Sequence, residues 1–81
     1  MVVDMETSTV LIWNKVGNKT NDIIDEILSI AKDIRICQVS YDNPYILAIT
    51  FNKEFVEDIV GLLYNIQNKY RFFFSVLNSS F

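Results

Sequence analysis

The chain has 81 residues, of which 51% are apolar, and a formal net charge of -3 at pH 7. This length allows one domain, and the apolar content is sufficient for a packed core and excludes a disordered chain. The 7 Lys and Arg residues form no cluster, and the net charge is negative. Nucleic-acid binding by the chain alone is therefore disfavoured, because phosphate contacts need a basic surface.

The sequence contains no histidine and one cysteine, Cys37. Without histidine, the chain lacks the usual general base at neutral pH and the commonest metal ligand. A single cysteine cannot form an internal disulfide, and we expect Cys37 to be a small buried residue of a strand. The sequence has no glycine-rich phosphate loop, metal-ligand cluster or nucleophile motif. We predict that the chain is not an enzyme and uses no cofactor or metal.

The N-terminal residues 1–8 are predicted to form a polar arm. They include Asp4 and Glu6, and they have neither the basic start nor the apolar run of a signal peptide. No stretch of the sequence is apolar and long enough to span a bilayer. We therefore expect a cytoplasmic protein.

Residues 9–16 are predicted to form the first strand, because both of its faces carry apolar side chains in alternation. Leu11 and Trp13 lie on one face. The opposite face carries Val10, Ile12, Asn14 and Val16.

A turn at Gly17-Asn18 separates this strand from a predicted helix that is capped by Thr20 or Asn21 and ends near Asp33. Its buried stripe consists of aliphatic residues at helical spacing. These residues are Ile23, Ile24, Ile27, Leu28, Ile30 and Ala31.

Two further strands are predicted at residues 34–41 and 45–51. The intervening Asp42-Asn43-Pro44 is a strong turn signal, because proline restricts its own backbone and that of the preceding residue. The two strands therefore form an antiparallel hairpin.

Residues 53–78 are predicted to form one long helix, capped by Asn52. Apolar residues recur along it at intervals of three and four and define one helix face. They are Phe55, Ile59, Leu62, Ile66, Tyr70, Phe73 and Leu77. The alternative is a strand at residues 71–77, because phenylalanine and valine favour strands.

A helix of this length has a structural consequence. Its 26 residues would extend about 39 Å, whereas a chain of this size folds into a body about 30 Å across. The apolar tip should then protrude and be covered by a partner protein. The predicted partner interface contains Phe72, Phe73, Phe74, Val76, Leu77, Leu11 and Trp13. Lys69 and Arg71, at the same end of the helix, are candidates for contact with RNA.

The predicted order of strand, helix, strand, strand and long helix indicates an α+β fold, a variant of the ferredoxin-like arrangement. Its sheet is antiparallel, with both helices on one face. The other face carries Leu11, Trp13, Ile46 and Ala48 and is more apolar than a solvated face should be. If residues 71–77 formed a strand, the fold would be the complete ferredoxin-like arrangement.

The pattern resembles the small dimerisation subunit of the KEOPS complex, which makes threonylcarbamoyl-adenosine in tRNA. The similar parts are the strand Tyr45-Ile-Leu-Ala-Ile-Thr-Phe51, which leads into Lys53-Glu-Phe-Val-Glu-Asp-Ile-Val60, and the continuation through residues 61–70. The resemblance implies a non-enzymatic subunit whose long helix packs against a larger catalytic subunit. Asn65 matches an asparagine of the family, but Gly61 and Ile66 stand where its members have arginine and serine. These departures suit a diverged paralogue that pairs with the regular subunit.

We accordingly predict a dimerisation and interaction subunit of a larger complex. It would form a homodimer, or a heterodimer with a paralogous subunit, and would contact RNA only through the complex. The alternatives are a ferredoxin-like domain that senses small molecules and a small viral protein that binds a host complex.

Overall fold

The computed structural model describes residues 6–14, 19–40 and 45–77. In chain order, its elements are β1 (Thr7–Asn14), α1 (Thr20–Leu28), β2 (Arg35–Ser40), β3 (Tyr45–Asn52), the 3₁₀ turn η2 (Lys53–Phe55), α2 (Val56–Tyr70) and β4 (Phe72–Leu77). The predicted α+β class is confirmed. The order is strand, helix, strand, strand, helix, strand, which is the complete ferredoxin-like arrangement.

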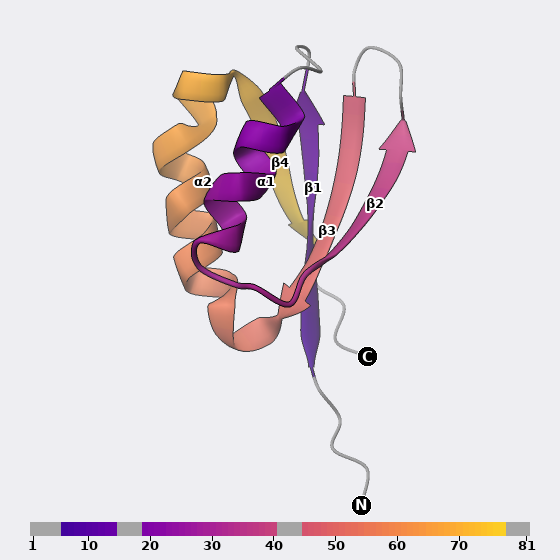
Figure 1. Cartoon of the computed structure of the whole chain (residues 1–81), viewed down its shortest axis with the longest axis vertical. Coiled ribbons are helices and arrows are strands. Elements are labelled where there is room, and N and C mark those ends of the chain that lie inside the picture. Colours follow the sequence, from indigo (N-terminus) through magenta and orange to yellow (C-terminus); the bar gives the residue numbers. More distant parts are fainter. Residues whose placement is uncertain (1–5, 15–18, 41–44, 78–81) are drawn as a thin grey trace, which may run out of the picture.

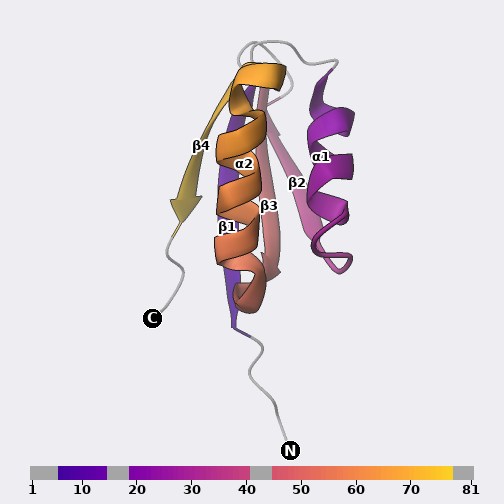
Figure 2. The same cartoon turned by 90° about the vertical axis from the view of Figure 1, so that its left-hand side faces the viewer.

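The four strands form one sheet in the order β2-β3-β1-β4, and all neighbouring strands are antiparallel. Both helices lie on the same face of this sheet (Figure 1). Seen from the helix side, α2 runs in front of β1 and β3, while β4 lies at the edge beyond α2 (Figure 2). The opposite face is not covered by any described element.

The core lies between the sheet and the helices and follows from the alternation of side chains along each strand. Val10 and Ile12 of β1 point into it, as predicted, while Val16 lies outside the described residues. The helices contribute aliphatic residues from one face each. These buried helix residues are Ile23, Ile27, Ile59, Leu63 and Ile66.

The prediction of one long helix at residues 53–78 is wrong, because α2 ends at Tyr70. Arg71 adopts the left-handed conformation, with φ 54° and ψ 65°, and its N–H donates to the Gln67 carbonyl at the end of the helix. The chain then turns back as β4, which pairs with all residues from Thr9 to Asn14 of β1. As a strand, this segment provides hydrogen-bond partners for the backbone along one side of β1.

The described residues therefore form no protruding helix tip. The 15 residues of α2 span about 22 Å, and the 8 residues of β1 span about 27 Å. The helix is therefore shorter than the strand it packs on, and the argument for a partner cannot rest on helix length.

Smaller differences concern the ends of elements. The first strand begins at Thr7, so Thr7 and Ser8 belong to the sheet and not to a polar arm. The first helix ends at Leu28, before the predicted end near Asp33. A turn follows in which the Ala31 N–H donates to the Ile27 carbonyl, and Ala31 is buried.

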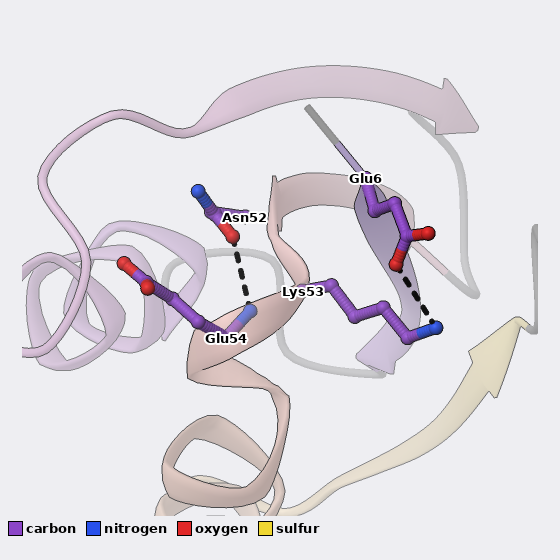
Figure 3. Close-up of polar contacts among 4 residues, drawn as sticks. All are labelled: Glu6, Asn52, Lys53 and Glu54. Carbon is purple, nitrogen blue, oxygen red and sulfur yellow. Dashed lines mark hydrogen bonds and ion pairs between the residues drawn. The ribbon is translucent and has the colours of Figure 1, made fainter. Parts of the chain in front are cut away.

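Glu6, which precedes β1, contacts Lys53 at the start of η2 (Figure 3). Asn52 caps this segment as predicted, since its Oδ1 accepts the Glu54 N–H at 3.0 Å. Lys53 forms an ion pair with Glu6, with Nζ and Oε2 3.3 Å apart, and its N–H donates to the Glu6 carbonyl. Both side chains of the ion pair are exposed, so we attribute the connection mainly to the backbone bond.

Within the described part of the chain, no helix has the length and apolar content required to cross a membrane.

Candidate protein interface

The face of the sheet opposite the helices is built from three rows of four residues that run across the strands in the order β2, β3, β1, β4. The first row is Ser40, Ile46, Trp13 and Phe73. The second row is Cys37, Ala48, Leu11 and Ser75. The third row is Arg35, Thr50, Thr9 and Leu77. We call these twelve residues the outer face.

The apolar character of the outer face changes from one end to the other. The first row brings Ile46, Trp13 and Phe73 side by side, which makes it aliphatic and aromatic. In the third row, the hydroxyls of Thr9 and Thr50 lie 2.9 Å apart and hydrogen bond to each other. The apolar end is therefore the part of this face that is least suited to contact with water.

One residue of the outer face, Arg35, is charged, and it lies at a corner on the edge strand β2. The rest of the described chain is different, since its carboxylates and ammonium groups are carried by the helices, by the turns that flank them and by Glu6 before β1. Depletion of charge together with exposed aromatic residues distinguishes the centres of protein interfaces from ordinary surface. The composition of the outer face is of this kind.

Strand β4 exposes apolar side chains on both of its sides. Phe73 and Leu77, on the outer face, are 68% and 42% exposed. Val76, on the helix side, is 41% exposed. Phe74 is half-buried there, because its ring packs edge-on against Tyr64 of α2 with centroids 4.9 Å apart.

The structure brings four of the seven residues of the predicted interface together on the outer face, places Phe74 and Val76 on the helix side, and buries Phe72 in the core. Leu11, Trp13, Phe73 and Leu77 all lie on the outer face, although the sequence placed two of them on a strand and two on a helix tip. Phe72 is 3% exposed and belongs to the core, so it is not available to a partner. Because side chains alternate along a strand, Phe72 and Phe73 project from opposite faces of the sheet.

The structure also places the three remaining residues that the sequence singled out, Cys37, Lys69 and Arg71. Cys37 is exposed, contrary to the prediction, because it lies on the outer face of an edge strand opposite Ala48. Lys69 and Arg71, the candidates for RNA contact, are exposed at the end of α2, where the Lys69 ammonium lies 5.1 Å from the centroid of the Tyr70 ring.

A groove of about 620 Å³ lies beside α2 and is lined by both apolar and polar residues. The lining consists of Ile30, Phe55, Glu57, Asp58, Gly61, Leu62 and Asn65. Gly61 is exposed, and a Cβ atom added at this position would meet no atom within 4 Å. Among the described residues, no three His, Cys, Asp or Glu side chains are grouped so that they could hold a metal ion.

Comparison with known proteins supports the fold and does not identify a function. No protein-family model and no curated protein matches the chain. Among solved structures, it is similar to "De novo designed protein Foldit4", with a TM-score of 0.54 and 14% sequence identity over 91% of this chain and 97% of that chain. At this identity, the likeness concerns the fold alone.

Proposed function

We propose that this chain is a non-enzymatic protein–protein interaction subunit and that its outer face binds another protein. The observation that carries the proposal is the row of Ile46, Trp13 and Phe73 on a sheet face with one charged residue at its corner. An antiparallel sheet with one solvated face normally alternates apolar and polar side chains. Here Leu11 and Trp13 are apolar on the outer face, while Val10 and Ile12 are apolar on the core face.

The size of the outer face limits what it can bind. Four strands about 4.8 Å apart and three rows about 7 Å apart give a flat patch of roughly 400 Å². A standard stable interface buries about 800 Å² on each partner. One copy of the outer face is therefore about half of such an interface, and the partner needs either a second contact or a second copy of this chain.

The expected partner surface is flat, mainly apolar and uncharged. Trp13 is the expected anchor, because tryptophan is among the residues that contribute most to binding at protein interfaces. Its neighbours across the strands, Ile46 and Phe73, would shield it from water in the complex.

A variant with a matched control tests the outer face. Trp13→Thr removes the anchor while keeping a residue that favours strands. The control is Tyr64→Ala, which removes another aromatic residue, 62% exposed, from helix α2. Tagged protein purified from its native cells should retain the same partner proteins in the wild type and in Tyr64→Ala, and lose them in Trp13→Thr. Retention of these proteins by Trp13→Thr, with its fold verified by circular dichroism, would refute the proposal.

The more specific proposal is a cytoplasmic assembly related to KEOPS, in which the partner is a paralogous subunit or the larger catalytic subunit. It rests on the sequence resemblance at residues 45–70. The argument from a protruding helix no longer contributes to it, because α2 ends at Tyr70 and provides no apolar tip for a catalytic subunit. In this proposal, Lys69 and Arg71 contact tRNA only within the assembled complex. Recovery of the KEOPS catalytic subunit with the wild type, and its loss with Trp13→Thr, is the expected result.

A second candidate function is the sensing of a small molecule, which the groove at Gly61 favours. Its apolar lining with two carboxylates, Glu57 and Asp58, would suit a small cationic or amphipathic ligand. A melting-temperature shift with one member of an amino-acid panel, abolished in Gly61→Leu, would support it. Equal melting temperatures across the panel would exclude those ligands.

A further inference from the structure

The two edges of the sheet are unlike each other. Strand β2 has features that hinder the addition of another strand. Its pairing with β3 is irregular between Gln38 and Ser40, and it begins with a charged residue, Arg35. The Gln38 amide also donates to the carbonyls of Ser40 at 2.6 Å and Ile46 at 3.2 Å.

Strand β4 has no such protection. Its six residues, Phe-Phe-Phe-Ser-Val-Leu, include no charge, proline or glycine, and its register with β1 is unbroken. In the described part of the chain, β4 pairs with β1 alone, so its other edge is open. An open edge with exposed apolar side chains on both of its sides is a template for another strand.

We propose that β4 pairs antiparallel with β4 of a second copy of this chain, so that two sheets join into one. The proposal deepens the proposed function by naming a partner and the strand through which it binds. An antiparallel strand can meet its own twofold copy, so one sequence supplies both sides of the contact.

Sheet geometry selects the register of this pairing. Residues opposite each other in a sheet project from the same face, so one residue of β4 must stand opposite its own copy, with the twofold axis midway between the two. An axis at Ser75 places Phe73 opposite Leu77 of the second copy on the outer face, and Phe74 opposite Val76 on the helix side. Each of these pairs joins an aromatic with an aliphatic residue, and Phe74 with Val76 is an aromatic and β-branched pair, a favourable combination across strands.

An axis at Phe74 fits less well. It would place Phe73 opposite the small Ser75, and Val76 opposite Phe72, which is already buried in the core. Leu77 would then lie opposite the charged Arg71. The Ser75 register covers the three most exposed apolar residues of β4, which are Phe73, Val76 and Leu77.

Pairing through β4 also changes the size of the outer face. Two copies of a roughly 400 Å² patch, joined edge to edge with helices on the same side, give about 800 Å², the area that a standard interface needs on one partner. The joined sheet therefore provides the missing half of the surface that the proposed function requires.

Charge substitution at Ser75 tests both the contact and its register. In the dimer, Ser75 faces its own copy, so Ser75→Lys or Ser75→Glu places two like charges opposite each other. In the monomer, this side chain is exposed, so either substitution should be tolerated. A 1:1 mixture of the two variants should dimerise again, because lysine then faces glutamate.

Sedimentation velocity measures the outcome. Strand-edge contacts are small, so we expect a weak dimer and would measure at about 0.2 mM. The wild type should approach twice the mass of the 9.4 kDa chain, each single variant should sediment as a monomer, and the mixture should form the heterodimer. A monomeric wild type, or single variants that still dimerise, would overturn the proposal, and a mixture that stays monomeric would overturn the register.

The results for the two proposals are separable. Trp13 lies on β1, on the side of β4 that faces away from the second copy, so Trp13→Thr should leave the dimer intact. A wild-type monomer whose partners are still lost in Trp13→Thr would refute the dimer and leave the proposed function standing. A dimer disrupted by Ser75→Lys, together with partners retained by Trp13→Thr, would refute the proposed function of the outer face and support the dimer.

Discussion

The substitution Arg71→Gly should stabilise the protein, because Arg71 holds a left-handed conformation, with φ 54°, between α2 and β4. This conformation costs an L-residue about 1–2 kcal/mol, and glycine adopts it without that penalty. Glycine also gains backbone freedom in the unfolded chain, which offsets about 0.4–1 kcal/mol of the benefit. The net expectation is a gain of about 0.5–1 kcal/mol in the free energy of unfolding, obtained from these two terms.

The sign of this effect distinguishes the observed turn from a continuous helix. Within a helix, the same substitution would lower the free energy of unfolding by up to about 1 kcal/mol. Lys69→Gly is the matched control, since Lys69 is exposed inside α2 and its replacement should be destabilising. Urea denaturation followed by circular dichroism measures both variants. If Arg71→Gly lost stability as Lys69→Gly does, the turn and strand β4 would be refuted.

Two further predictions concern strand β4 and helix α2. Phe72→Ala should lower the free energy of unfolding by about 3–5 kcal/mol, because Phe72 is 3% exposed in the core. Phe73→Ala should cost the monomer much less, since Phe73 is 68% exposed; equal losses of stability in dilute solution would contradict the alternation of a strand. Gly61→Ala should raise the free energy of unfolding by up to about 1 kcal/mol, because Gly61 lies inside α2 and a methyl group there meets no atom within 4 Å. An unchanged or lower urea midpoint for this variant would show that a side chain is not accommodated there.

Much of the fold could be predicted from local patterns. Alternation along residues 9–14 and the cap at Asn52 each depend on neighbouring residues, and the elements they predict are present. The turn predicted at Asp42-Asn43-Pro44 lies outside the described residues, while the strands before and after it pair antiparallel as predicted. The placement of both helices on one face followed from the amphipathic stripes. These signals act over a few residues, so a single sequence contains them.

The strand β4 could not be predicted in this way. The spacing of Tyr70, Phe73 and Leu77 continues the helical period, while the chain from Phe72 to Leu77 also suits a strand. The choice is made by a distant element, since β4 pairs with β1 and Phe72 fills the core opposite Asn14. The sequence has no glycine at the end of α2 that would have indicated a turn, because the left-handed position is occupied by Arg71.

The exposure of Cys37 also depends on the assembled sheet. A cysteine in a strand is usually buried, but β2 is an edge strand and its outer side is covered by no described element. One of the two sequence arguments for association, the protruding helix tip, is not supported by the structure, because its residues form strand β4. The apolar residues are present, but they belong to a sheet surface and not to a helix tip.

The strand β4 strengthens the argument for a partner by changing where that partner would bind. A helix tip would have separated Phe73 and Leu77 from Leu11 and Trp13, leaving two small apolar surfaces. Pairing of β4 with β1 places Phe73 beside Trp13 and Leu77 beside Thr9, so that these residues share the outer face. A single face of roughly 400 Å² is still small for a stable complex, and β4 at its border is the strand through which a second copy can enlarge it. Association at the edge and recognition on the face are therefore two uses of the same apolar strand, and Ser75 and Trp13 are the positions that separate them.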